Sequence, residues 1–509
     1  MIRSTFASFT TAQLAMRASQ NGLDITGQNI SNINTTGYTR QNIDQVSLNT
    51  TNPNYYSNSN SYNIGYGVKV TGTSQTRDAY LDIRFRNQMS KVGTEDSKLN
   101  GLEDLESIFD ETSATGLKTQ IDTLASKLQT LSSHPGETEY DTLVRGAAQS
   151  LTNLFNSNAK EVETVRENHE TELQDVTIRG LNDTLSKIVD LNKSIRIAEI
   201  NGMSTLELQD SRNLLLDDLS SYMKIDVKYT DGGTKYADAM ANIGRSVQDI
   251  TITTTDSSGN VITLINNGDA APTFSVEKDA ATGNMNLTYT VSGDPDPKAF
   301  DPSEGTIKGE LDFLNQSPDE GRGIQYYEKQ MNDFAAALAT KFNELNKGSD
   351  GTGFLLFTSG DAANPGSGIT AANIQISADW LSGKTIIPSQ TDNSDGSTAN
   401  DNILSMIQLL ERKDIQIGDG AKTSFLGFYD SLLTTLNEDI SSGTSILENY
   451  VTVADSLATS RDNISAVSLD EEGINILQYQ KSFNAAARMM TALDEALDTV
   501  INSMGVVGR

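Results

Sequence analysis

The chain has 509 residues, with 38 Lys and Arg against 68 Asp and Glu, so its formal net charge is −30. This charge repels phosphate backbones and anionic lipid surfaces, so we expect no nucleic-acid partner. The sequence contains no cysteine, which excludes disulfides, thiolate nucleophiles and cysteine-ligated metal centres.

No run of the sequence approaches the roughly 18 consecutive apolar residues of a membrane span. The first twenty residues, MIRSTFASFTTAQLAMRASQ, also lack the continuous apolar core of a secretory signal peptide. We therefore expect no membrane span, and ordinary sorting would leave the chain in the cytoplasm.

The first predicted element is a helix over about thirty residues with a heptad pattern. Its large apolar residues recur every seven positions, with smaller residues at most of the intermediate core positions. The large residues are Ile2, Phe9, Met16, Leu23 and Ile30, and the intermediate positions are Thr5, Ala12, Ser19, Thr26 and Ile33. One edge of this helix is strongly apolar and the other is mostly small.

The helix is expected to break within NISNINTTGYTRQ, residues 29–41. Asn34 and Thr36 carry side chains that cap or turn the backbone, and Gly37 is the expected residue of positive φ. Tyr38 then begins the passage to the next part of the chain. We interpret this stretch as a joint between two layers of the molecule.

Proline placement divides the middle of the chain, because seven of the nine prolines lie between residues 272 and 388. Apolar residues at three- and four-residue steps predict one or two very long helices over 137–198. Shorter helical patterns, which indicate a bundle built from distant parts of the chain, cover 75–110, 116–131, 205–223, 322–346 and 422–464.

Between about residues 225 and 310 the apolar period changes to two. The segments IDVKYT, QDITITTT, NVITLINN, TFSVEKD and NMNLTYTV predict an antiparallel β unit inserted into the helical part. Residues 350–400 are rich in Gly, Ser, Asn and Asp, and predict loops with two or three strands.

The C-terminal helix has a complete apolar seam over nine consecutive core positions. These are Ile476, Tyr479, Phe483, Ala486, Met490, Leu493, Leu497, Val500 and Met504. Ser468 is a plausible N-cap, and Asp470, Glu471 and Glu472 stabilise the N-terminus of the helix dipole.

Heptad helices at both ends favour antiparallel pairing of the two termini. One pair of helices leaves its flanks uncovered, so we expect other subunits to cover them. The predicted fold is mainly α with a β-rich insertion: an elongated multidomain chain with paired terminal heptad helices, a long-helix bundle and an inserted antiparallel β domain.

We predict three domains. A terminal coiled-coil assembly domain comprises 1–40 with 470–509. A long-helix bundle comprises 41–224 with 311–469, and a β domain is inserted at 225–310.

Each sequence motif that resembles a catalytic or ligand-binding site lacks a required residue, so we predict no catalytic, cofactor-binding or metal site. The string HETEL at His169 lacks the second histidine of a zinc-protease motif, and His134 in SSHPG fits a helix end. ADWLSGKT (378–385) lacks the first glycine of a phosphate-binding loop, and DPDPKAFDPSEG (294–305) lacks two required residues of a calcium loop.

Both ends of the chain resemble one protein family. MRASQNGLDITGQNISNINTTGYTRQ resembles the N-terminal signature of the bacterial flagellar rod, hook and hook-associated axial proteins, and SLDEEGINILQYQKSFNAAARMMTALDEALDTVIN resembles their C-terminal signature. The internal LELQDSRNLLLDDLSSYMKIDV (206–227) and the segment 305–346 are similar to a hook-associated member.

The resemblance implies a noncatalytic structural protein of the hook–filament junction that self-assembles into a ring beneath the filament. It implies type III export without a cleaved signal peptide and an extracellular location on the flagellum. The implied partners are further copies of the chain, the hook protein, a filament-side hook-associated protein and a cytoplasmic export chaperone.

Two alternatives remain open at this point. The chain could be another axial protein, such as the filament-side junction protein or the hook protein, which should lack the pattern at 206–227. It could also be a surface adhesin or enzyme with axial-type ends, with glycan binding by exposed loops in 225–400.

Overall fold

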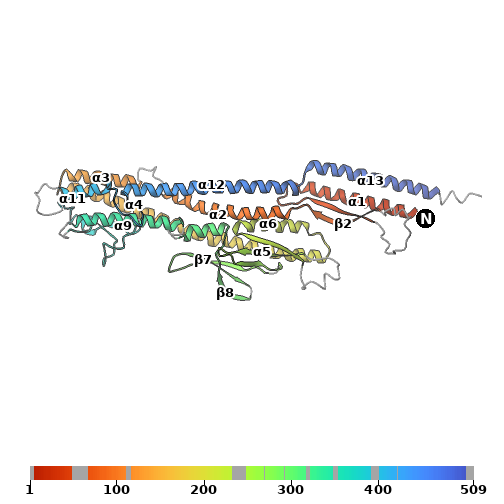
Figure 1. Cartoon of the computed structure of the whole chain (residues 1–509), viewed down its shortest axis with the longest axis horizontal. Helices are drawn as coiled ribbons and strands as arrows, with labels where there is room; N and C mark the ends of the chain where they lie inside the picture. Colours follow the sequence, from red (N-terminus) through yellow and green to blue (C-terminus); the bar gives the residue numbers. More distant parts are fainter. Residues whose placement is uncertain are drawn as a thin grey trace, which may run out of the picture.

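The computed structural model forms an elongated, mainly helical rod, with small sheets on its flank and the N-terminus near one end (Figure 1). The residues that the structure describes are 5–48, 67–109, 116–231, 248–268, 270–291, 293–316, 321–347, 353–390, 400–420 and 422–499. Within them, no helix is long and apolar enough to cross a lipid bilayer.

The terminal helices form one end of the rod. Helices α1 (Thr5–Ser31) and α13 (Leu469–Asp498) lie side by side along much of their length (Figure 1). A hairpin of β1 (Gln41–Ser47) and β2 (Val68–Gln75) follows α1 in the chain and contacts it. The predicted pairing of the two terminal helices is confirmed.

Two long helices connect this end to the rest of the rod. Helix α2 (Ala79–Phe109) and helix α12 (Phe425–Ser465) pack against each other. They run antiparallel, because Phe85 near the start of α2 contacts Arg461 near the end of α12. At their other ends Phe109 lies near the first turns of α12.

The long helix predicted over 137–198 is confirmed as one continuous helical run. It comprises α4 (Thr138–Glu172), a short π-helix η1 (Leu173–Thr177) and α5 (Ile178–Ile200). The remaining helices are α3 (Leu117–Ser132), α6 (Leu206–Tyr222), α8 (Thr306–Asn315), α9 (Ile324–Asn346), α10 (Ala378–Leu381) and α11 (Asp401–Glu411).

Besides the β1–β2 hairpin, the strands among the described residues form two three-stranded sheets and one short pair, all antiparallel. The sheets are β3 (Ile225–Asp231), β4 (Gln248–Thr255) and β5 (Val261–Ile265); β6 (Thr273–Lys278), β7 (Met285–Val291) and β8 (Asp294–Ala299); and β9 (Phe357–Thr358) with β10 (Gln375–Ile376). The alternation predicted for β6 is present, since Phe274 and Val276 are buried while Thr273 and Ser275 are exposed.

Several elements differ from the sequence-based expectation, because the β1–β2 hairpin and the helices α8 and α10 were not predicted. DPDPKA, which was not among the predicted strands, forms β8 and pairs with β7 alone among the described strands. A strand with one neighbour tolerates prolines, because one of its edges needs no backbone donors. The helix α11 follows directly on the segment predicted as loops and was not predicted.

The apolar core lies in the body of the rod. Buried apolar residues of the helices from α2 to α12 and of the sheets β3–β5, β6–β8 and β9–β10 form one continuous cluster. Helices α1 and α13 and the β1–β2 hairpin contribute no described residue to it. The buried apolar residues of the terminal pair are only Ala12, Ala18 and Ala486 among those described. The fold class is therefore the predicted one, while the domain boundaries remain a prediction.

Candidate assembly interface and joint

The contact between α1 and α13 is built on small residues of α1. A Cβ atom at Gly22 would lie 2.6 Å from Cε1 of Tyr479, so the tyrosine ring lies directly on the glycine backbone. No other residue than glycine allows an aromatic ring this close. Tyr479 is half-buried, and burial is the main cause that raises the pKa of its phenol.

The polar groups in this contact are satisfied within α1 itself. The hydroxyl of Ser19 donates to the carbonyl of Ala15 at 2.9 Å, and that of Thr26 donates to the carbonyl of Gly22 at 2.8 Å. Both side chains are buried, and such bonds to the preceding turn leave no unpaired donor. The small, polar edge of the N-terminal heptad is thus the edge covered within the chain.

The large heptad residues are placed differently. Half-buried side chains are Phe9, Met16, Leu23 and Ile30 on α1, Ile33 in the turn after α1, and Ile476, Tyr479, Phe483, Met490, Leu493 and Leu497 on α13. Of the predicted set, only Ala486 is buried, and Ile2, Val500 and Met504 lie outside the described residues. The pair therefore leaves most of its large apolar side chains partly uncovered.

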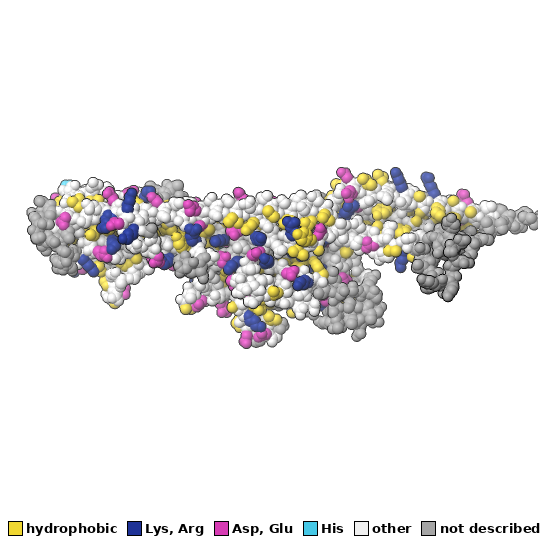
Figure 2. All heavy atoms as spheres, viewed as in Figure 1, with side chains coloured by type: hydrophobic (Ala, Val, Ile, Leu, Met, Phe, Trp, Pro, Cys, Tyr) yellow, Lys and Arg dark blue, Asp and Glu magenta, His cyan; other side chains and the backbone are white. Residues whose placement is uncertain are grey.

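Helix α13 also carries large apolar side chains in the open. Ile474 is 64% exposed, Leu469 and Leu477 are each 57% exposed, and Met489 is 45% exposed. Figure 2 shows apolar side chains along this end of the rod, between a few charged groups. These side chains have little cover within the described part of the chain.

The predicted joint follows α1 directly. Gly37 has φ +78°, as expected, and a Cβ atom there would lie 3.1 Å from Cδ1 of Leu214 on α6. Asn34 and Thr36 are exposed in the turn, and Tyr38 is half-buried. The backbone therefore leaves the helix through glycine, because the turn requires the left-handed conformation.

Asn29 organises the joint, although no sequence pattern singles it out beyond its place in the stretch 29–41. Its side-chain amide donates to the carbonyl of Gln41 at 2.9 Å, and its Oδ1 accepts from the Gln41 amide at 3.1 Å. The same oxygen accepts from the hydroxyl of Tyr38 at 2.9 Å. Burial is the largest cause that raises the pKa of Tyr38 to about 12, and the negative charge of Asp210 is the next largest. The hydroxyl therefore keeps its proton and remains a donor.

Arg40 links the joint to the start of α13. Its Nε donates to Glu472 at 2.8 Å, a second guanidinium nitrogen pairs with Glu471, and its amide donates to the carbonyl of Ser465. The acidic residues expected only to favour the helix N-terminus therefore also bind a cation. Ser468 occupies the N-cap position but makes no side-chain cap bond, which corrects its predicted capping role.

The side chains of the motifs that resemble catalytic or ligand-binding sequences make contacts within the fold. His169 lies 3.1 Å from Asp104 and packs on the edge of Phe313. In the segment ADWLSGKT, the indole of Trp380 donates to the buried carboxylate of Asp141. The described residues contain no cluster of three side chains suited to a metal ion.

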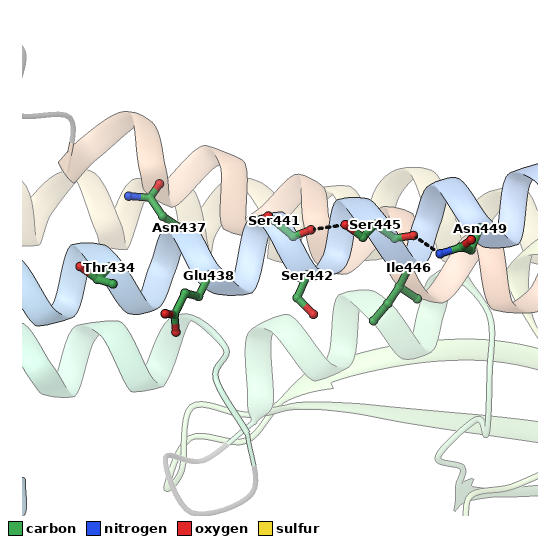
Figure 3. A pocket seen from close by; sticks show the side chains of 8 residues that line it. All are labelled: Thr434, Asn437, Glu438, Ser441, Ser442, Ser445, Ile446 and Asn449. Atoms are coloured by element: carbon green, nitrogen blue, oxygen red, sulfur yellow. Dashed lines mark hydrogen bonds between the residues drawn. The ribbon is translucent and has the colours of Figure 1, made fainter.

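A shallow depression on α12 is also unlike a catalytic site (Figure 3). Its lining is Thr434, Asn437, Glu438, Ser441, Ser442, Ser445, Ile446 and Asn449, with Glu438 as the one ionisable group. Ser445 and Asn449 donate to backbone carbonyls one turn earlier, as Figure 3 shows.

Comparison with known proteins covers the whole chain. The family model "Flagellar hook-associated protein FlgK helical domain" matches residues 102–355. Models of the "Flagella basal body rod protein" and of the "Flagellar basal body rod FlgEFG protein C-terminal" match residues 9–39 and 460–504. The three matches include both terminal segments and much of the body.

Curated relatives span the same length. The chain is 32% identical to flagellar hook-associated protein 1 of Bacillus subtilis over 99% of this chain and 100% of that protein. It is 23% identical to flagellar hook-associated protein 1 of Escherichia coli over 96% of this chain and 98% of that protein.

A solved structure shares the fold. The flagellar hook junction protein FlgK from Burkholderia pseudomallei aligns with a TM-score of 0.53 at 14% identity, covering 75% of this chain and 100% of that one. The full-length sequence identity to the Bacillus protein assigns the chain to its family, and the shared fold agrees with this assignment. The chain belongs to the family of flagellar hook-associated protein 1, whose members are structural proteins of the bacterial flagellum.

Proposed function

We propose that this chain is a noncatalytic structural subunit of the hook–filament junction, and that it assembles into a ring through α1 and α13. Its membership of the hook-associated family supports the location, and a solved structure that shares its fold is a hook junction protein.

The observation that carries the assembly step is the division of the α1–α13 surface. Small side chains of α1 lie between the two helices, whereas the large heptad residues are half-buried. A monomer gains little from large apolar residues that face water, but a ring of copies buries them. Neighbouring terminal pairs are then the surface that covers Phe9, Met16 and Leu23 on α1 and Phe483 and Met490 on α13.

The same reading gives the other units their roles. The terminal domain (1–40 with 470–509) forms the assembled layer, and the helix bundle (41–224 with 311–469) lies outside it. The inserted β domain (225–310) then faces solvent, with residues 34–38 as the joint between the first two layers. Sheets β3–β5 and β6–β8 project from the flank of the rod, which agrees with this arrangement (Figure 1).

The partners follow from the junction. They are further copies of the chain, the hook protein on one side and a filament-side hook-associated protein on the other. A cytoplasmic chaperone binds the chain before export. The chain then leaves the cell through the flagellar type III channel, without a cleaved signal peptide. A sequence without cysteine is suited to this route, because no disulfide can form between exported chains.

The test removes residues 470–509, which include α13. When the truncated chain replaces the hook-associated protein 1 of a motile bacterium, the cells should form hooks without attached filaments. Export is measured separately as the amount of chain in the culture medium, so that a secretion defect is distinguished from a junction defect.

The matched control is full-length chain with Lys384→Ala, which removes an exposed ion pair with Asp379 in the body. This variant should support filaments at the level of the unmodified chain, because exposed pairs contribute little to stability. Filaments that persist on hooks assembled with the truncated chain would overturn the proposed function.

A further inference from the structure

The terminal pair is connected to the body by few chain crossings. The segment 32–40 leads from α1 to β1, Thr76–Asp78 leads from β2 to α2, and 466–468 leads from α12 to α13. All three crossings lie close to Asp210 or to its neighbours on α6. The direction of the terminal pair relative to the body is therefore decided in a small region.

A cavity lies under the joint. It has a volume of about 370 Å³ and lies between the loop at Thr35–Thr39, helix α6 and the end of α12. Its lining includes Asn213 and Asp462, so polar groups face it. Apolar side chains such as Ile33, Leu214 and Val467 line it as well, so both polar and apolar contacts hold the loop at the cavity edge.

Asp210 on α6 makes the central contacts. It is only 6% exposed. Its Oδ2 accepts from the Thr39 amide at 3.0 Å and its Oδ1 accepts from the Thr39 hydroxyl at 2.7 Å. Its Oδ2 also accepts from the side-chain amide of Gln75 at 2.8 Å. One carboxylate therefore holds the chain that leaves α1 and the chain that returns from β2.

Asp210 is also the end of a row of alternating charges. Arg77 lies 3.8 Å from Asp210 and 2.6 Å from Asp82. Arg461 on α12 lies 3.7 Å from Asp82 and also pairs with Asp217, which in turn pairs with Arg86. The row joins the crossing into α2 with α2, α6 and α12, so the groups that hold Asp210 are themselves fixed in the body.

We propose that Asp210 is the positioning residue of the joint, which sets the direction in which the α1–α13 pair leaves the body. A buried carboxylate with three hydrogen bonds permits one arrangement of its donors, because every other arrangement leaves a buried charge unpaired. This inference rests on the proposed function only for the reason why a fixed direction is needed: a ring requires that all copies present their terminal pairs at one angle.

The test measures this angle on the isolated chain. Because the sequence has no cysteine, spin labels can be placed at two introduced cysteines without background. One pair, Gln480→Cys with Ser456→Cys, spans the joint from α13 to α12, and both positions are exposed. A second pair, Ser431→Cys with Ser456→Cys, lies wholly on α12 and reports the rigidity of the body.

In the otherwise unmodified chain, both pairs should give narrow distance distributions. Asp210→Ala should broaden the distribution across the joint and shift its mean, while the α12 pair stays narrow. Thr39→Val, which removes one donor and leaves α6 intact, should give a smaller broadening in the same direction. Asp141→Ala, at a buried carboxylate far from the joint, should leave the joint distribution unchanged.

Sedimentation of each labelled sample verifies that it is monomeric, and circular dichroism verifies that it is folded. A narrow and unshifted joint distribution in both Asp210→Ala and Thr39→Val would overturn the proposal. That result is independent of the truncation experiment, because filaments formed without residues 470–509 would reject the junction role and leave the monomer geometry untouched.

Discussion

Gly22 and Tyr479 fix how the two terminal helices meet. The ring of Tyr479 occupies the space where any side chain at position 22 would begin. Sliding α13 along α1 by one turn would bring the ring against a residue with a side chain. A single glycine therefore selects one register in a contact that has few other large buried groups.

Gly22→Ala should accordingly separate the terminal helices. The new methyl group would lie 2.6 Å from the tyrosine ring, so ring or helix must move, at a cost of about 1–3 kcal/mol. We expect faster limited proteolysis within α1 and fewer hook-borne filaments, with an unchanged melting curve of the body.

Gly27→Ala is the matched control for this substitution. Gly27 is exposed on the same helix, and a Cβ atom there would have no neighbour within 4 Å. The change should stabilise α1 slightly, by up to about 1 kcal/mol from helix propensity. Equal behaviour of the two variants in the proteolysis assay would contradict the role of the Gly22–Tyr479 contact.

Glu310 is a second residue with a specific consequence, this time for pH. Its Oε1 accepts from the Thr177 hydroxyl at 2.8 Å in the π-helix η1, while its Oε2 is buried without a partner. Burial is the largest cause that raises the pKa of this carboxyl to about 8, and Glu172 adds to the rise. At neutral pH the folded chain therefore holds Glu310 as the neutral acid.

A raised carboxyl pKa makes stability fall as pH rises. The unfolded chain releases this proton near its ordinary pKa of 4.5, and the folded chain releases it near 8, so the loss accumulates between these values and then levels off. Glu310→Gln should remove this slope and exceed the unmodified chain at pH 9 by roughly 2–5 kcal/mol. Urea unfolding midpoints between pH 5 and 9 give the comparison, and parallel curves would contradict it.

At the scale of elements, periodicity predicted the long helices but not the shorter α8 and α11, although each of these buries one face in the core. The three- and four-residue steps over 137–198 predicted the run of α4, η1 and α5, and the alternation of Phe274 and Val276 predicted β6. The described side chains of β8 are mostly exposed, so this strand has no burial alternation that a sequence pattern could reveal. It depends on its antiparallel pairing with the neighbouring strand β7.

The candidate site shows the same limit. The heptad pattern predicted which residues lie on the terminal seam, but it could not predict which edge of α1 faces α13. That choice depends on close approach at Gly22, which is a property of two helices together. The bonds from Arg40 to Glu471 and Glu472 span more than four hundred residues, and no spacing rule predicts them.

Helix α10 and the loop that follows it depend on a single buried carboxylate. Asp141 on α4 pairs with Arg145 at 2.7 Å, accepts from Trp380 Nε1 at 3.2 Å, and accepts from the Ile387 amide at 2.9 Å. Asp141→Ala should therefore release the segment 378–387 from α4, with a loss of about 1–3 kcal/mol of local stability. Hydrogen exchange at the Ile387 amide measures the release.

Asp379→Asn is the control within the same segment. It weakens only an exposed ion pair with Lys384 and should leave exchange at Ile387 within about twofold of the unmodified chain. If Asp141→Ala also left this amide protected, the loop would be held by its apolar contacts and not by the carboxylate.

At the scale of the whole molecule, stability is distributed unevenly along the rod. The body contains one continuous apolar core, whereas α1 and α13 bury only three alanines among their described apolar side chains. Elements with few buried apolar contacts open at a lower free energy than the core. The end of the rod that would assemble is thus the least stable part of the isolated chain.

This distribution predicts a difference between monomer and assembly in hydrogen exchange. In a monodisperse monomer, amides in the middle of α1 and α13 should exchange at least about tenfold faster than those in the middle of α9, because fewer contacts oppose their opening. In assembled rings or isolated junctions, the same amides should become protected, since neighbouring copies cover the half-buried heptad residues. Strands β6 and β7 are the internal control, with equal exchange in both states. Terminal helices that are as protected as α9 in the monomer would show that each chain completes its own terminal contact, and that assembly uses another surface.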